Sequence, residues 1–146
     1  ESCGTAAGCG IPTSGDRKLL DLVATFTATD NLSFVLNYDK AEQDKALTGN
    51  AKAKWNGLAA YANYKISDPW RVSFRTESFD DKDGFRTGTT QKLKENTLTL
   101  AHIPAKNVEL RAEVRKDKSN QSTFTEGGGT PTKSQDSLGL EAIYKF

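Results

Sequence analysis

One pattern recurs seven times along this chain: apolar side chains occupy every second position in stretches of roughly ten residues. Residues 107–117 (NVELRAEVRKD) show it best, because Val108, Leu110 and Val114 alternate with charged residues. Successive side chains of a β-strand point to opposite faces, whereas an amphipathic helix repeats every 3.6 residues. The pattern therefore predicts strands that have one apolar face and one polar face.

The predicted strands are joined by two kinds of connection. The strands cover residues 19–29, 32–40, 55–66, 70–79, 95–103, 107–117 and 138–146. Three connections are short and carry Asp, Asn or Pro, near residues 30, 68 and 105, and the other three are long and polar. Short turns on one side and long loops on the other are typical of outer-membrane barrels.

The composition leaves little material for a second layer that would cover the apolar faces. Only 36% of the residues are hydrophobic and 27% are charged, which is too few apolar residues for a two-layer sandwich. No run approaches the ~20 apolar residues of a membrane helix. If the apolar faces contact lipid, no second protein layer is needed. We therefore expect an all-β fold, an antiparallel transmembrane β-barrel.

The seven predicted strands indicate that the chain is part of a larger barrel. Single-chain bacterial barrels have an even number of strands. A complete eight-stranded barrel would need a strand within residues 1–15, which show no suitable alternation. We expect part of a larger even-stranded barrel, in which residues 1–17 form an extracellular loop segment and residues 18–146 form the barrel strands, turns and loops.

Cys3 and Cys9 enclose a short segment rich in Gly and Ala. In an oxidising compartment they would form a disulfide that stabilises the fold by roughly 2 kcal/mol, and two free thiols are the alternative. A metal site would need more ligands than two cysteines, and the only histidine, His102, is distant in the sequence. We predict the disulfide, no metal and no cofactor.

The last strand, LGLEAIYKF (residues 138–146), resembles the signal by which bacterial outer-membrane proteins are passed to the barrel insertion machinery, with Tyr144 and Phe146 at the matching positions. Together with LLDLVATFTATDNLSFVLNYD, WNGLAAYANYKISDPWRVSFRTESFDDKDGFRTGT and NVELRAEVRKDKS, it is similar to the C-terminal part of the putative beta-barrel porin-2 (OmpL-like) family, over residues 17–146. Members of that family are longer than this chain. The resemblance implies a porin in the outer membrane of a Gram-negative bacterium, with no catalytic residue to transfer.

The polar face of the strands is where selectivity would be set, since lumen residues control passage through a barrel. The alternation assigns to it seven acidic and six basic residues: Asp21, Asp39, Glu77, Glu95, Glu109, Glu113 and Glu141, with Lys65, Arg71, Arg75, Arg111, Arg115 and Lys145. This near balance predicts little ion preference. Alternatively, these residues form salt bridges between adjacent strands and stabilise the wall.

Aromatic residues near the strand ends predict the girdles that lie at both membrane boundaries. Phe26, Tyr64, Trp70 and Phe146 fall near the short turns. Tyr38 and Trp55 fall near the long loops.

Other kinds of chemistry are poorly supported. In the acidic loop DDKDG (residues 80–84), Phe79 and Thr90 stand where an EF-hand-like calcium loop needs Asp and Glu. His102 has no evident nucleophile to activate, so we do not expect an enzyme. The net charge of +1 gives no reason to expect nucleic acid binding.

Two functions remain open. The first is passive diffusion of small hydrophilic solutes or ions through an open barrel. The second is a non-conducting structural or scaffold barrel whose extracellular loops bind a surface partner. The expected partners are outer-membrane lipid and lipopolysaccharide, the barrel insertion machinery, and other barrel subunits or surface proteins.

Overall fold

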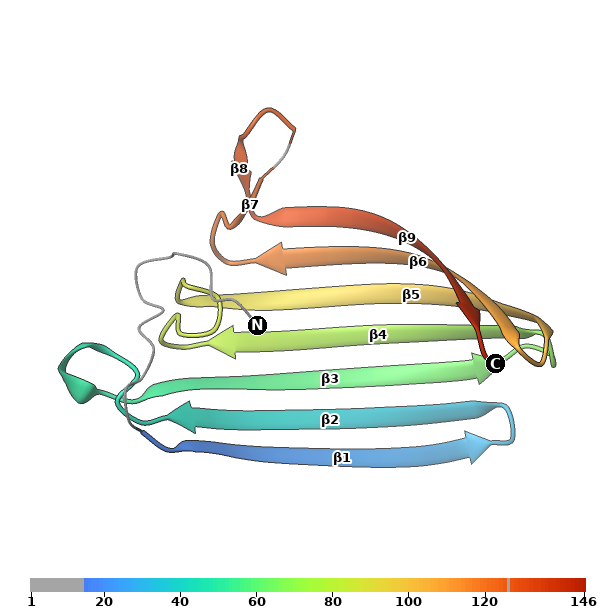
Figure 1. The fold of residues 1–146 in the computed structure, drawn as a ribbon, viewed down its shortest axis with the longest axis horizontal. Coiled ribbons are helices and arrows are strands. Elements are labelled where there is room, and N and C mark those ends of the chain that lie inside the picture. Colours follow the sequence, from blue (N-terminus) through green and yellow to red (C-terminus); the bar gives the residue numbers. More distant parts are fainter. Residues whose placement is uncertain (1–14, 126) are drawn as a thin grey trace.

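Seven long antiparallel strands form one sheet in chain order (Figure 1). This computed structural model describes residues 15–125 and 127–146. The strands are β1 (Arg17–Thr29), β2 (Leu32–Gln43), β3 (Ala53–Lys65), β4 (Trp70–Asp81), β5 (Gln91–Ala105), β6 (Val108–Ser119) and β9 (Ser134–Tyr144). All seven strands that the alternation predicts are present.

The connections have the asymmetry that the sequence predicts. Figure 1 shows short turns at one end of the sheet and long connections at the other. The β1–β2 turn is held by Thr29, whose Oγ1 accepts hydrogen bonds from the backbone N–H groups of Asn31 (3.2 Å) and Leu32 (3.0 Å). The long connections contain a 3-10 turn, η1 (Thr48–Asn50), and a small hairpin of β7 (Phe124–Thr125) and β8 (Pro131–Thr132). No helix in the described part of the chain is long and apolar enough to cross a membrane.

The strand register separates apolar from polar residues across the whole sheet. One row of directly opposed residues is apolar on five successive strands: Tyr64, Val72, Leu100, Ala112 and Leu140. The adjacent row, one residue along each strand, is Lys65, Arg71, Ala101, Arg111 and Glu141. Because neighbouring rows point to opposite faces, the sheet has one apolar face and one polar face.

The sheet is not closed. β1 and β9 are its two edges, and no pairing joins them among the described residues. The structure therefore shows a seven-stranded antiparallel sheet, and a closed barrel remains a prediction.

The last strand is shifted toward the N-terminus relative to the prediction, because β9 begins at Ser134 and not at residue 138. β9 ends at Tyr144, so the prediction that it continues to Phe146 is wrong by two residues. The backbone N–H of Lys145 still donates to the carbonyl oxygen of Asn107 at 2.9 Å, which keeps the end of the chain against the β5–β6 turn.

Candidate functional site

The burial of side chains is inverted relative to a water-soluble sheet. On β5, Leu98 and Leu100 are 47% and 40% exposed, whereas Glu95 and Thr97 on the opposite face are only 8% and 4% exposed. The same face exposes large apolar side chains on all seven strands, among them Leu22, Phe34, Leu58, Phe74, Leu110 and Leu140. We call this surface the apolar face. A soluble protein rarely leaves so continuous an apolar surface uncovered.

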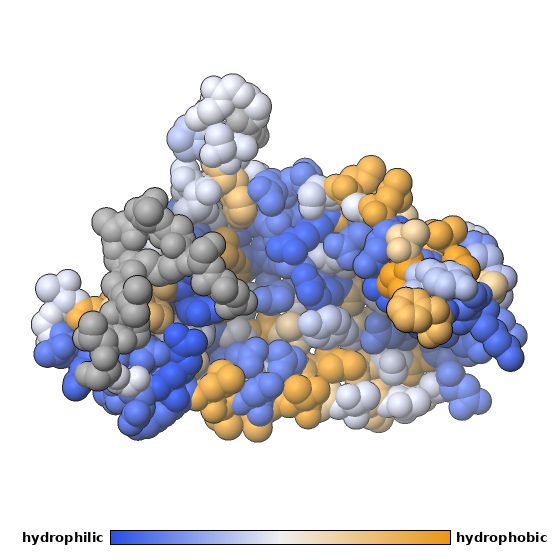
Figure 2. All heavy atoms as spheres, in the orientation of Figure 1, coloured by the Kyte–Doolittle hydropathy of each residue, from blue (hydrophilic) through white to orange (hydrophobic). Residues whose placement is uncertain are grey.

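The opposite face forms a polar trough. Its cavity measures about 950 Å³ and draws side chains from all seven strands, including Thr27, Ser33, Tyr61, Arg75, Thr99, Glu113 and Glu141. Figure 2 shows hydrophilic residues over the middle of the sheet. Polar groups from many strands therefore converge in the trough.

A salt-bridge cluster lies on the trough face beside this cavity, and three of its members, Glu95, Arg115 and Asp117, line a smaller hollow of about 260 Å³. Glu95 on β5 lies between Arg75 on β4 and Arg115 on β6. Its carboxylate accepts hydrogen bonds from Arg75 Nε at 2.7 Å and from Thr97 Oγ1 at 2.7 Å, and it lies 2.8 Å from Arg115 Nη2. Arg115 Nε also donates to both carboxylate oxygens of Asp117 at 3.0 Å. Four charged side chains thus link three neighbouring strands.

A second cluster lies nearer the short turns. Arg111 Nε donates to Glu109 Oε1 at 2.8 Å, and Arg111 Nη1 donates to Glu141 Oε2 at 3.1 Å across the β6–β9 pair. Lys145 Nζ lies 3.9 Å from Glu109 Oε2. Beside this cluster, Thr99 Oγ1 donates to Glu113 Oε2 at 3.0 Å. Arg111 and Arg115 each use a planar, forked guanidinium group to contact two carboxylates, a geometry that lysine does not offer.

The structure places all thirteen charged residues predicted for the polar side on or against the trough face. Strand register places twelve of them there, and Lys145 reaches Glu109 from beyond β9. Their pairing is uneven. Asp21 accepts a hydrogen bond from Asn37 Nδ2 at 2.7 Å, and Lys65 pairs with Asp68 in the β3–β4 turn at 2.6 Å. No hydrogen bond or ion pair within the described chain involves the side chains of Asp39, Arg71 or Glu77.

The predicted girdle aromatics do not all lie on one face. By register, Phe26, Tyr38, Tyr64 and Trp70 are on the apolar face, and Phe146 follows the end of β9. Trp70 stacks on His102 with ring centroids 4.3 Å apart, which gives the lone histidine a packing role at the turn end.

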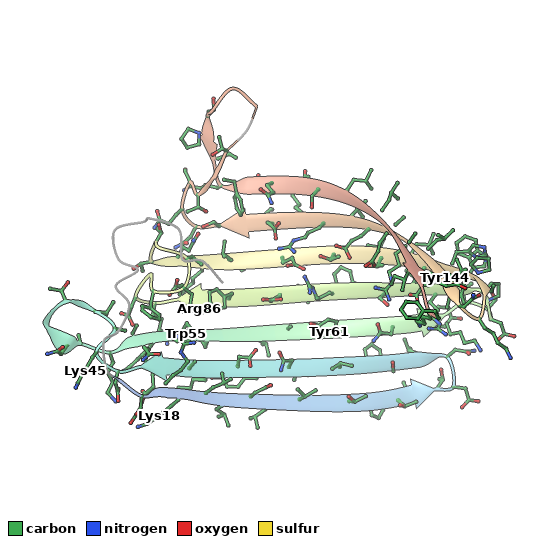
Figure 3. All side chains as sticks on the ribbon, in the orientation of Figure 1. Lys18, Lys45, Trp55, Tyr61, Arg86 and Tyr144 are labelled. Atoms are coloured by element: carbon green, nitrogen blue, oxygen red, sulfur yellow. The ribbon has the colours of Figure 1, made fainter. Side chains whose placement is uncertain are left out.

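The assignment of Trp55 to the girdle is wrong. Trp55 is on the trough side, in register with Ala41 and Asp81, and it is buried. Its ring stacks on Phe85 at 5.7 Å, and the guanidinium groups of Arg17 and Arg86 lie 5.8 Å and 5.5 Å from the ring centroid. Figure 3 shows Trp55 and Arg86 close together at the loop end of the sheet.

The loop over Trp55 is held by a carboxylate that sequence reasoning missed. Asp81 is fully buried, and its Oδ2 accepts hydrogen bonds from the backbone N–H groups of Arg86 (2.9 Å) and Thr87 (2.7 Å). Asp83 Oδ2 accepts from the backbone N–H of Lys54 at 2.7 Å. Gly84 has φ +67, and a Cβ there would lie 2.8 Å from Thr90 N. The acidic loop DDKDG therefore uses its carboxylates to shape a turn against the sheet.

Charge pairs in the connections after β2 and β3 shift two carboxyl pKa values. The hydrogen bond from Lys52 lowers the pKa of Asp44 in the β2–β3 loop, and the same contact, 2.9 Å long, raises the pKa of Lys52. The hydrogen bond from Lys65 lowers the pKa of Asp68 in the β3–β4 turn. Asp68 is solvent-exposed and Asp44 is partly exposed, so water screens these interactions.

Two predictions lie outside what the structure describes or tests. Cys3 and Cys9 are not among the described residues, so the disulfide remains a prediction. Within residues 15–125 and 127–146, no group of three or more His, Cys, Asp or Glu side chains is arranged to hold a metal ion.

The comparison with protein families agrees with the fold and with the two-faced sheet. Residues 3–146 match the family described as "Putative beta-barrel porin-2, OmpL-like". Comparisons with curated proteins and with solved structures find no match. The match confirms the resemblance carried by the alternating strands and extends it to nearly the whole sequence. This chain belongs to the putative beta-barrel porin-2 (OmpL-like) family.

Proposed function

We propose that this protein is a porin-like channel of the bacterial outer membrane, through which small hydrophilic solutes or ions diffuse passively. The observation that carries the proposal is the inverted burial on the five inner strands, β2 to β6: apolar side chains are exposed on one face, while carboxylates and arginines on the other face are more buried. In a bilayer the apolar face would contact lipid, and the trough would become part of the wall of a water-filled lumen. The family description supports the same function.

The trough has the properties expected of a weakly selective pore wall. Acidic and basic side chains alternate over its surface, and the salt bridges neutralise the charge of Glu95 and Glu109 locally. Asp39, Arg71 and Glu77, whose side chains make neither a hydrogen bond nor an ion pair in the described chain, are the groups most available to passing ions. One of these three is basic and two are acidic, so this section of wall gives a small net preference for cations.

The second candidate is a non-conducting structural or scaffold barrel whose extracellular loops bind a surface partner. The salt-bridge clusters favour it, because paired charges that link neighbouring strands can fill a narrow barrel. The packing of the loop that follows β4 onto Trp55 favours it as well, because that loop covers part of the trough at the loop end.

The same reasoning extends to targeting and to assembly. In the proposed function, Tyr144 and Phe146 present the insertion signal to the barrel insertion machinery, and the long connections face the cell exterior. Residues 1–17 would then lie on that exterior side, where an oxidised Cys3–Cys9 pair is chemically stable. Other barrel subunits or surface proteins would meet the protein at these loops. No catalytic residue is part of the proposal.

Single-channel conductance distinguishes the two candidates. The natively purified protein is inserted into a planar bilayer under a salt gradient, and heat-modifiable gel mobility confirms that it is folded. Regular, long-lived conductance steps with weak selectivity are the expected result. A folded, inserted protein that gives no steps would refute the channel and support the scaffold.

A further inference from the structure

Lysines replace the apolar residues of the apolar face toward the long loops. On β2 the outward sequence changes from Tyr38 to Lys40, on β5 from Leu98 to Lys94, and on β6 from Val114 to Lys116 and Lys118. The register puts seven such lysines on this face, and we call them the lysine band: Lys18, Lys40, Lys54, Lys92, Lys94, Lys116 and Lys118. Figure 3 shows Lys18 at the loop end of β1.

Carboxylates on the same surface neutralise only part of the band. Glu42 lies 3.8 Å from Lys18, Asp80 lies 3.5 Å from Lys92, and Asp136 lies 3.0 Å from Lys116. The other four lysines, Lys40, Lys54, Lys94 and Lys118, form no ion pair within 4.0 Å in the described chain.

Lys94 and Lys118 are directly opposed across the β5–β6 pair. Like charges in that position destabilise a sheet unless an anion lies between them. Both side chains belong to exposed residues, so their ammonium groups are available to an external anion.

Near β1, β2 and β3, three lysines of the band line a hollow. Its volume is about 420 Å³, and Lys18, Lys40, Lys54 and Lys82 line it together with Leu20 and Glu42. Four ammonium groups beside an apolar side chain suit a ligand that has both anionic and apolar parts. A lipid with a phosphorylated headgroup is such a ligand.

The type of cation also differs between the two faces. Arginines line the trough and form forked salt bridges with neighbouring carboxylates. The band contains only lysines, which are mobile point charges on long apolar stems and bind phosphate without a fixed geometry. At the opposite end of the sheet, the three short turns together contain a single lysine, Lys106. The positive charge of the outer surface is therefore concentrated at the loop end.

We propose that the lysine band binds the phosphate groups of lipid in the membrane leaflet on the long-loop side. The inference rests on the proposed function, because it needs the apolar face to contact the bilayer. In an outer membrane this leaflet consists of phosphorylated lipopolysaccharide, so the ligand class is a phosphorylated glycolipid. The band fixes the depth of the protein in the bilayer and holds these lipids around the wall.

The test compares lipid binding by variants of the full chain folded in bilayers. Lys94→Gln/Lys118→Gln removes the opposed pair, Lys94→Arg/Lys118→Arg keeps its charge, and Lys106→Gln removes a lysine at the other end. The probes are the phosphorylated lipid moiety of lipopolysaccharide and the same lipid after enzymatic dephosphorylation. Each lysine near an anionic surface contributes about fivefold in affinity, so the double Gln variant should bind roughly 25-fold more weakly. The Arg variant and Lys106→Gln should bind like the unmodified protein.

The outcomes separate this inference from the channel function. Equal binding of phosphorylated and dephosphorylated lipid by the unmodified protein would overturn the inference without using any variant. Equal loss in Lys106→Gln and in the double Gln variant would also overturn it, because the effect would then not depend on position. Conductance measured on the same preparations tests the channel by itself: steps that persist while lipid binding shows no phosphate dependence would refute only the lysine band.

Discussion

Glu95→Gln should destabilise the sheet strongly, whereas Glu77→Gln should not. The two glutamates face each other directly across the β4–β5 pair, so both substitutions remove the same charge from the same part of the trough. Glu95 is buried and contacts Arg75, Arg115 and Thr97, while Glu77 has no hydrogen bond or ion pair among the described residues. The pair thus separates the effect of charge from the effect of contacts.

The expected loss of stability follows from the arginines that lose their partner when Glu95 is replaced. Removing one partner of a fully buried ion pair costs about 3–5 kcal/mol. The side chains of Arg75 and Arg115 are 32% and 39% exposed, so water can replace part of the lost interaction. We expect Glu95→Gln to lower the free energy of unfolding by about 2–3 kcal/mol. Glu77→Gln should change it by less than about 0.5 kcal/mol, or raise it slightly by removing a like-charge neighbour of Glu95.

Urea unfolding from lipid vesicles, followed by tryptophan fluorescence, measures the difference. With a slope near 2–3 kcal/mol per molar, the midpoint for Glu95→Gln should fall by about 1 M relative to Glu77→Gln. Equal midpoints for the two variants would refute the structural role of the salt-bridge cluster. Reversal potentials in a salt gradient provide the complementary reading, because both variants should shift selectivity toward anions by similar amounts.

Three further predictions concern the apolar face, the end of the chain and the loops. Leu98→Arg, in the middle of the apolar face, should cost about 2–4 kcal/mol in vesicle unfolding, whereas Ser73→Arg on the trough face should cost less in the same assay. Phe146→Ala should reduce the amount of protein assembled in the outer membrane while leaving the conductance of assembled channels unchanged, and normal amounts would argue against an insertion signal. The pKa of Asp44 is lowered in the folded state, so its pairing with Lys52 stabilises the β2–β3 loop at pH values above the unfolded pKa, near 3.9. This stabilisation is lost as the pH falls through the lowered folded pKa, and protease cleavage of the loop should increase over that range. Lys52→Gln should remove this pH dependence.

The sequence predicted the strands and their faces well because the two faces of this sheet differ in polarity along each strand. Every strand must keep one face apolar, so alternation in residues such as 107–117 is read directly as a strand with two environments. The register needed no extra information, since an offset by one residue would place Arg111 on the apolar face and Leu110 on the polar face. The turns were predictable for a similar reason: Asp30 and Pro69 belong to residue types that favour tight turns.

The roles of residues at the loop end were less predictable because they depend on local packing between the strands and the loops. Trp55 continues the alternation of β3 on the trough side, but a large aromatic near a strand end looked like a girdle residue. Only the fold of the following loop shows that Phe85 covers it. The role of Asp81 depends on backbone N–H groups five and six residues later, which no alternation reveals. Pairing between charged residues was equally invisible, because Glu95 and Glu77 have the same parity and very different partners.

The direction of the edge strands limits how this sheet can become a barrel. In an antiparallel sheet of seven strands the first and seventh run the same way, and Figure 1 shows β1 and β9 both pointing toward the short turns. If β1 and β9 paired with each other, the pair would be parallel. A second copy arranged around the same axis would not avoid this, because each junction would again set β9 against β1. Closure with antiparallel pairs throughout therefore requires an odd number of additional strands between β9 and β1, and those strands would complete the wall around the trough.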